Sequence, residues 1–116
     1  MLCFIDETRE YLAGKLRKGK TMSGEEAAAF IEQIKSYLPG CVEKVLLRAD
    51  GEFLSWKSVQ ACIAAGFQFI IANKGCNPPF DPNAWYRPWK RKDIEYNSCT
   101  YKPIGWGLEC RFVAMR

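Results

Sequence analysis

The stretch from residue 44 to residue 72 constrains the fold of this chain most strongly, because it alternates between strand, helix and strand patterns. Residues 44–49 are mostly apolar, and a polar turn that begins at Asp50 follows them. Ser55 is placed to cap a helix that Gly66 would end, and residues 67–72 form a second apolar run. Strands joined by a helical crossover pair in parallel. The pattern therefore predicts a β–α–β unit with Asp50 at the carboxyl edge of its sheet.

The residues before this unit predict a hairpin and an amphipathic helix. Residues 2–5 and 11–16 are strand-like and are separated by a short polar segment. Ser23 and Glu26 have the spacing of a capping box. The helix that follows has apolar residues at helical spacing and a terminating Pro-Gly pair: Ala27, Phe30, Ile31, Ile34, Leu38, Pro39 and Gly40. In the later helix we expect Val59, Cys62 and Ile63 to face the core.

The last third of the chain predicts a loop and two strands. Proline, glycine and asparagine interrupt any periodicity over residues 73–89. Residues 94–101 and 108–115 then have the pattern of antiparallel strands. Together with the earlier elements, these strands predict an α/β fold of the α+β kind, with a mixed sheet.

The composition is that of an ordinary globular protein. The chain has 116 residues, of which 48% are hydrophobic and 26% charged, so one core is expected. No apolar run approaches the roughly 20 residues that span a bilayer. The first residues also lack the pattern of a signal peptide. We therefore expect a cytoplasmic protein with no membrane partner.

The cysteine and histidine counts restrict the chemistry. Six cysteines lie far apart without a C-x-x-C pair, which disfavours a zinc site, and we expect them to be reduced and mostly buried. The chain has no histidine, so Ser-His and Cys-His nucleophile pairs are excluded. Of the common catalytic mechanisms, those based on carboxylates and metal ions remain.

Two basic windows hold nearly half of the 17 lysines and arginines in a chain whose net charge is +4. Such clusters neutralise phosphates, and aromatic side chains beside them can stack on bases. The alternative interpretation is a solvated surface whose tryptophans cover the edge of the core. The first window contains Lys15, Arg17, Lys18 and Lys20, and the second contains Arg87, Lys90, Arg91 and Lys92 beside Trp85, Tyr86 and Trp89.

Asp50 is the candidate catalytic and metal-binding residue. A carboxylate after a strand can ligate a hard cation such as Mg²⁺, but one carboxylate makes a poor metal site. An aspartate can equally cap the turn after a strand, without any ligand. Glu52 is a candidate extra ligand or a solvent-facing turn residue.

The order of these segments resembles the order of segments in one protein family. The block LRADGEF, then a helix, a glycine and the strand FQFIIANK, is similar to the "R-A-D-S-G-F" block of insertion-sequence DDE transposases, whose catalytic core is ribonuclease-H-like. LRKGK, upstream, resembles the "L-R-x-G-N" of one branch of that family. The strand ECRFVAMR near the C-terminus resembles part of its β-rich insertion. The resemblance covers nearly the whole chain.

The resemblance implies an internal fragment of a DNA transposase. Residues 1–74 would be a partial ribonuclease-H-like core, and residues 75–116 a Trp-rich loop with the β insertion. In this family three acids hold two divalent ions, Mg²⁺ or Mn²⁺, and Asp50 matches the second acid. The first acid would lie on a strand before Met1 and the last on a helix after Arg116. The isolated chain would therefore be inactive. Within the block itself, Gly51-Glu52 stands where the family usually has Ser-Gly.

The implied partner is DNA at insertion-sequence ends. The eight basic residues named above would contact phosphates, and Trp85 and Trp89 would stack near a flipped or hairpinned end. Two alternatives from other classes remain: a non-catalytic nucleic-acid-binding module, and a small interaction or scaffold protein. A ribonuclease-H-like nuclease would need two further acids near Asp50. An exposed sheet edge would also allow a dimer.

Overall fold

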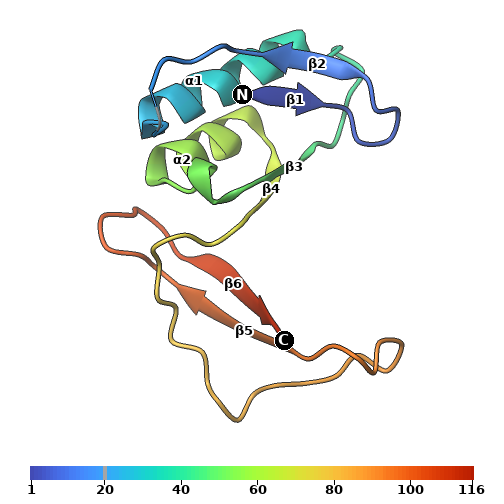
Figure 1. Cartoon of the computed structure of the whole chain (residues 1–116), viewed down its shortest axis with the longest axis vertical. Coiled ribbons are helices and arrows are strands. Elements are labelled where there is room, and N and C mark those ends of the chain that lie inside the picture. The colour runs from blue at the N-terminus through green and yellow to red at the C-terminus, as the bar shows by residue number, and fades with distance from the viewer. Residues whose placement is uncertain (20) are drawn as a thin grey trace. The chain divides into compact units, whose positions relative to one another are not determined.

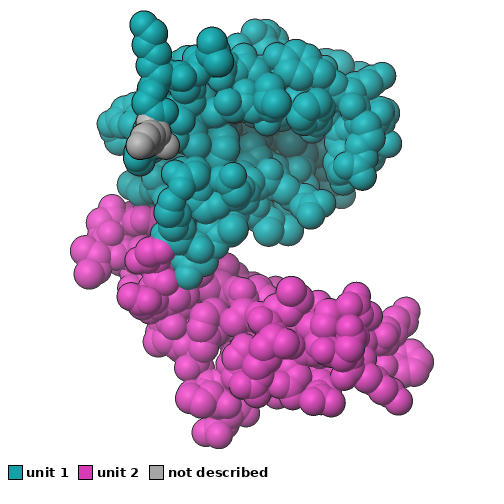
Figure 2. All heavy atoms as spheres, viewed as in Figure 1, with its two compact units in different colours: residues 1–74 teal, residues 75–116 magenta. Residues whose placement is uncertain are grey.

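The structure is a computed structural model that describes residues 1–19 and 21–116. The chain divides into two compact units, Met1–Lys74 (unit 1) and Gly75–Arg116 (unit 2), which Figure 2 colours separately. The described residues form two α-helices, a short 3₁₀ helix and six strands in three two-stranded sheets. The mixed α/β class is therefore confirmed, although the described strands do not join into one mixed sheet. No helix in the described part of the chain is long and apolar enough to cross a membrane.

Unit 1 opens with the predicted hairpin. Strands β1 (Leu2–Phe4) and β2 (Tyr11–Gly14) pair antiparallel, with a register shift between Cys3 and Phe4 (Figure 1). Alternate residues of a strand point to opposite faces. Ala13 is accordingly buried against the core, whereas Phe4 is exposed on the outer face.

Helix α1 (Gly24–Tyr37) begins at the predicted capping box. The Ser23 side chain accepts a hydrogen bond from the Glu26 backbone N–H at 3.1 Å. The Ser23 backbone also lowers the pKa of the Glu26 carboxyl, in line with the reciprocal contact of a capping box. The helix ends at Tyr37 with Leu38 as its C-cap, directly before the Pro39-Gly40 pair that the sequence predicts to stop it. Its buried residues are Ala27, Phe30, Ile31 and Ile34.

The predicted β–α–β unit is confirmed. Strands β3 (Leu46–Ala49) and β4 (Gln68–Ile71) pair in parallel, and helix α2 (Trp56–Ala65) connects them. The Ser55 hydroxyl caps α2 by accepting a hydrogen bond from the Ser58 backbone N–H. Gly66 ends α2 in the left-handed region, at φ 74°, where a residue without a Cβ is favoured.

The core of unit 1 lies where α1 and α2 pack side by side (Figure 1). Val59 and Cys62 on α2 are fully buried, as predicted. The prediction for Ile63 is wrong, because its side chain is 49% exposed. The inward stripe of α2 instead runs through the small residues Ser58 and Ala61, which allow the two helices to approach closely.

Only one face of the β3–β4 pair is covered. Leu47 and Phe69 pack against the core, whereas Leu46 and Ile70 are largely exposed on the opposite face. Near-continuous apolar runs of this kind are typical of parallel strands that are buried on both faces. The helices α1 and α2 cover a single side, so the second face stays open among the described residues.

Unit 2 is built on the predicted antiparallel pair, β5 (Tyr96–Tyr101) and β6 (Cys110–Met115). Tyr86, in the preceding loop, forms a β-bridge with Tyr96. The buried Asn97 side chain donates a hydrogen bond to the Asp81 carbonyl at 2.6 Å, which ties the same loop to the hairpin.

The cysteines are free, and fewer are buried than the sequence suggested. Only Cys62 is fully buried, Cys41 is exposed, and the other four are partly exposed. Burial raises the pKa of the Cys62 thiol to about 11, so this group stays protonated at neutral pH. Cys62 therefore acts as a small core residue, in line with its position between α1 and α2.

The cap of α2 leads to a stability prediction. Ser55→Ala removes the helix cap and also the hydroxyl that pairs with the buried Ser58 hydroxyl at 2.9 Å. We expect the free energy of unfolding to fall by about 1–2 kcal/mol, measured by chemical denaturation. Ser36→Ala, on the exposed end of α1, is the matched control and should change it by less than about 0.5 kcal/mol. Equal effects of the two substitutions would contradict a stabilising cap.

Candidate functional site

Asp50 lies exposed at the carboxyl end of β3. It is the N-cap of the 3₁₀ helix Gly51–Phe53, where its Oδ1 accepts a hydrogen bond from the Glu52 backbone N–H at 3.0 Å. Its Oδ2 accepts no hydrogen bond from the described residues. The carboxylate of this exposed residue is thus oriented through one oxygen, which fits both a turn cap and a metal ligand.

The residues after Asp50 are held by Lys74, which follows β4. The Lys74 ammonium forms an ion pair with the Glu52 carboxylate. A Cβ at Gly51 would lie only 2.9 Å from the Lys74 Cβ. This close approach gives a physical reason for glycine at position 51. Glu52 is directed to a cation of this chain, which weakens its case as an extra metal ligand.

Arg48 lies on the same strand face as Asp50, but its guanidinium forms an ion pair with Asp6. Its Nη1 lies 3.7 Å from the Asp6 Oδ2, and Asp6 also pairs with Arg9. No group of three or more potential metal ligands occurs among residues 1–19 and 21–116. The Asp50 neighbourhood therefore offers one well-positioned hard oxygen within the described chain.

In the first basic window, Arg17 is held inside unit 1. Its guanidinium lies 2.8 Å from the Glu26 carboxylate and also donates to the Thr21 carbonyl at 2.7 Å. The Arg17 side chain is only 16% exposed. The hydrogen bond from Arg17 holds the pKa of the Glu26 carboxyl below its usual range. Because Glu26 belongs to the capping box, Arg17 serves to anchor the start of α1.

The lysines of this window are more open. Lys15 continues β2, with its backbone N–H donating to the Met1 carbonyl at 2.9 Å, and its side chain is exposed. Lys18 is also exposed and forms no ion pair within the described residues. The predicted contact at Lys20 lies outside the described residues.

In the second window, both arginines pair with acids. Arg87 and Arg116 flank Glu95, at 3.1 and 2.8 Å from its two carboxylate oxygens. Arg91 pairs with Asp93 at 3.2 Å. Sequence reasoning missed Glu95 and Arg116, because the pair is 21 residues apart in the chain. No local spacing signals a contact that forms only when β5 and β6 meet.

The aromatic residues of this window differ in availability. The Trp89 side chain is 84% exposed, and its neighbours Lys90 and Lys92 are exposed without ion pairs in the part of the chain that is described. The Arg116 guanidinium lies over the Trp85 ring, 4.1 Å from its centroid, so one ring face is already occupied by a cation. Trp89 therefore offers the more open surface for stacking.

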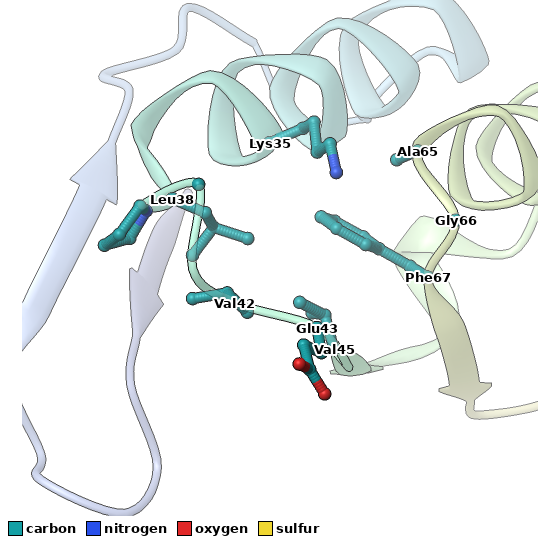
Figure 3. A pocket seen from close by; sticks show the side chains of 10 residues that line it. Lys35, Leu38, Val42, Glu43, Val45, Ala65, Gly66 and Phe67 are labelled. Atoms are coloured by element: carbon teal, nitrogen blue, oxygen red, sulfur yellow. The ribbon is translucent and has the colours of Figure 1, made fainter.

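A separate pocket of about 280 Å³ lies in unit 1, at the C-terminal ends of the two helices (Figure 3). The Lys35 ammonium points over the Phe67 ring, 5.8 Å from its centroid. This volume is at the lower limit for ligand pockets. None of the residues proposed from the sequence lines it. The lining residues are Lys35, Leu38, Pro39, Gly40, Val42, Glu43, Val45, Ala65, Gly66 and Phe67.

Comparison with known proteins gives no match: no protein-family model, curated protein or solved structure is significantly similar to this chain.

The pairing around Glu95 makes a prediction about titration. The hydrogen bonds from Arg116 and Arg87 lower the pKa of the Glu95 carboxyl. The stability that this contributes is fully present above the ordinary glutamate pKa and is lost as the pH falls through the lowered one. We expect Arg116→Gln to move the Glu95 midpoint upward, measured by NMR titration of the side-chain carboxyl. Arg111→Gln, which removes an equal charge on β6 itself, should leave the Glu95 midpoint in place; equal shifts would contradict the specific contact.

Proposed function

We propose that this chain is an interior segment of an insertion-sequence DDE transposase and that, in isolation, it binds DNA without cleaving it. The observation that supports this best is Asp50 itself. An exposed carboxylate follows the first strand of a parallel β–α–β unit, where ligand and metal sites of open α/β sheets commonly lie. Its position in the LRADGEF block is the one that resembles the second acid of the family.

The donor chemistry of Asp50 fits a divalent ion. Carboxylate oxygens suit Mg²⁺ and Mn²⁺, and Asp50 is an exposed residue whose Oδ1 alone accepts a hydrogen bond among the described residues. In the complete protein, bound ions would supply the Lewis acidity for attack of water or a DNA 3′ hydroxyl on a phosphodiester. Asp50 would coordinate one of these ions through Oδ2. The Glu52 N–H, which donates a hydrogen bond to Oδ1, fixes the orientation of the carboxylate.

The other acids would come from outside these 116 residues. Strands β1 and β3 belong to separate sheets, and each pairs with one strand only among the described residues. The Arg48–Asp6 ion pair links the hairpin turn to β3. We propose that a strand preceding Met1 joins these two sheets and carries the first acid, and that the last acid follows Arg116.

DNA binding by the isolated chain would depend on the exposed lysines more than on the arginines. Lys18, Lys90 and Lys92 are exposed without an ion pair in the described chain, and Trp89 presents an open ring beside the latter two. Phosphate neutralisation and base stacking need groups of these two kinds. The same residues also support the second candidate function, a nucleic-acid-binding module without catalysis.

Metal binding at Asp50 is tested by titrating Mn²⁺ and following backbone NMR signals. A lone carboxylate predicts a dissociation constant of about millimolar or weaker, with paramagnetic broadening centred on Asp50. Asp50→Asn should abolish this broadening and leave the fold intact, because the asparagine oxygen can still cap the turn. Glu52→Gln, with the same change in charge, should retain it.

The possible outcomes separate the interpretations. Micromolar or tighter Mn²⁺ binding would contradict the fragment interpretation, because one carboxylate cannot provide it. Broadening that persists in Asp50→Asn would remove Asp50 from the site.

DNA binding is tested by fluorescence anisotropy with a duplex over a series of salt concentrations. The double substitution Lys90→Gln, Lys92→Gln should weaken binding and reduce the slope of log K against log salt by about 1.8, since each phosphate contact contributes about 0.9. The matched control, Lys44→Gln, Lys102→Gln, removes the same charge at exposed sites outside both windows. If both variants lose the same affinity, the loss reflects net charge and not a contact of Lys90 or Lys92 with phosphate. If the native chain does not bind DNA at physiological salt, the scaffold alternative is favoured.

A further inference from the structure

Strand β6 presents an open edge and an open face. It is six residues long and pairs in regular register with β5, and no other described strand pairs with it. Its sequence, CRFVAM, contains no proline or glycine and only one charge. Val113 and Met115 are 55% and 64% exposed on the same face of the strand. Such an edge is a template for pairing with another strand.

The hydrogen bonds at the end of the hairpin define which backbone groups of β6 point outward. Glu95 and Arg116 exchange both of their backbone hydrogen bonds, at 2.9 and 3.0 Å. Hydrogen-bonded and non-hydrogen-bonded pairs alternate along an antiparallel ladder. Three residues of β6 therefore direct their N–H and C=O groups away from β5: Arg111, Val113 and Met115.

The bridge on the opposite edge supports this assignment. Tyr96 lies across from Met115, and its N–H and C=O are used by Tyr86 at 2.9 Å on the side away from β6. Tyr96 and Met115 thus form a non-hydrogen-bonded pair, as the alternation requires. The outward groups of Met115 have no such partner among the described residues.

We propose that β6 is a homodimer interface, in which it pairs antiparallel with β6 of a second copy, centred on Val113. This register places Val113 opposite Val113 of the partner subunit and Arg111 opposite the partner's Met115. Every outward-pointing residue then meets another outward-pointing residue, so the pairing forms about six backbone hydrogen bonds. The proposal concerns this chain itself and does not rest on the transposase assignment.

The side chains are self-complementary in this register. The only charged residue of β6 faces a methionine, so no like charges are opposed across the twofold axis. Val113 and Met115 of both copies form one apolar strip on the face that is open in the single chain. The dimer would convert two isolated hairpins, which are marginal on their own, into a four-stranded sheet.

Other open edges in the chain are protected from this kind of pairing. β1 has three residues and a register shift, and β3 and β4 have four residues each. Arg48 adds an exposed charge to β3. Short edges, bulges and charges are the usual means of preventing edge pairing, and β6 has the fewest of them.

The test is the association state of the full chain under reducing conditions, measured by sedimentation velocity over a range of concentrations. The native sequence should show a reversible monomer–dimer equilibrium. Val113→Lys opposes two lysines at the axis and should lower the association constant about tenfold or more. Ser98→Lys adds the same charge to the same face of the hairpin, but on β5, and should leave dimerisation nearly unchanged.

A charge exchange distinguishes the proposed register from loss of folding. Val113→Lys and Val113→Glu should each be mainly monomeric, and an equimolar mixture should form heterodimers that native mass spectrometry resolves. A native chain that stays monomeric at the highest soluble concentration would overturn the proposal. A dimer that persists in Val113→Lys, or a mixture without heterodimers, would also overturn it.

Discussion

The packing of α1 against α2 is the interaction on which the rest of unit 1 depends. Phe30 and Ile31 on α1 and Cys62 on α2 are buried in this core, and a fully buried Phe or Ile side chain contributes about 1.5–3 kcal/mol of transfer free energy. The hairpin joins this core through Ala13, and the parallel pair joins it through Leu47 and Phe69. A two-stranded parallel sheet has little stability of its own. The position of Asp50 at the end of β3 therefore depends on helix packing and on the cap at Ser55.

Within the two basic windows, the described arginines form ion pairs and the described lysines do not. Arg17, Arg87 and Arg91 all pair with carboxylates of the same chain, as planar guanidinium groups commonly do. Lys90 and Lys92 keep their charges in solvent. The positive charge that is free to meet phosphate is thus smaller than the number of basic residues in the two windows suggests. Among the described residues of the two windows, it is carried by Lys15 and Lys18 in unit 1 and by Lys90 and Lys92 in unit 2.

Three small sheets in one short chain leave many backbone groups at strand edges. A larger sheet would satisfy these groups within one molecule, whereas two-stranded sheets must use solvent, loops or a partner chain. The Tyr86 bridge covers the start of β5, and the register shift disrupts β1. β6 has neither feature and is longer than β2, β3 and β4, so the edge most exposed to pairing among the described strands lies in unit 2. The open strands of unit 1 are consistent with the proposal that further sequence completes its sheet.

The sequence alone determined the order and type of the elements, because periodicity, the caps at Ser23 and Ser55 and the left-handed Gly66 are local signals. It also singled out Asp50, since its place after an apolar run is visible without any structure. The exposure of Ile63, the bare face of β3 and β4, and the pairing of Glu95 with Arg87 and Arg116 were decided only in the tertiary structure. Each of these depends on which surfaces meet across large distances along the chain. Local patterns predict which face of a segment is apolar, but the number of elements available to cover that face is a property of the whole fold.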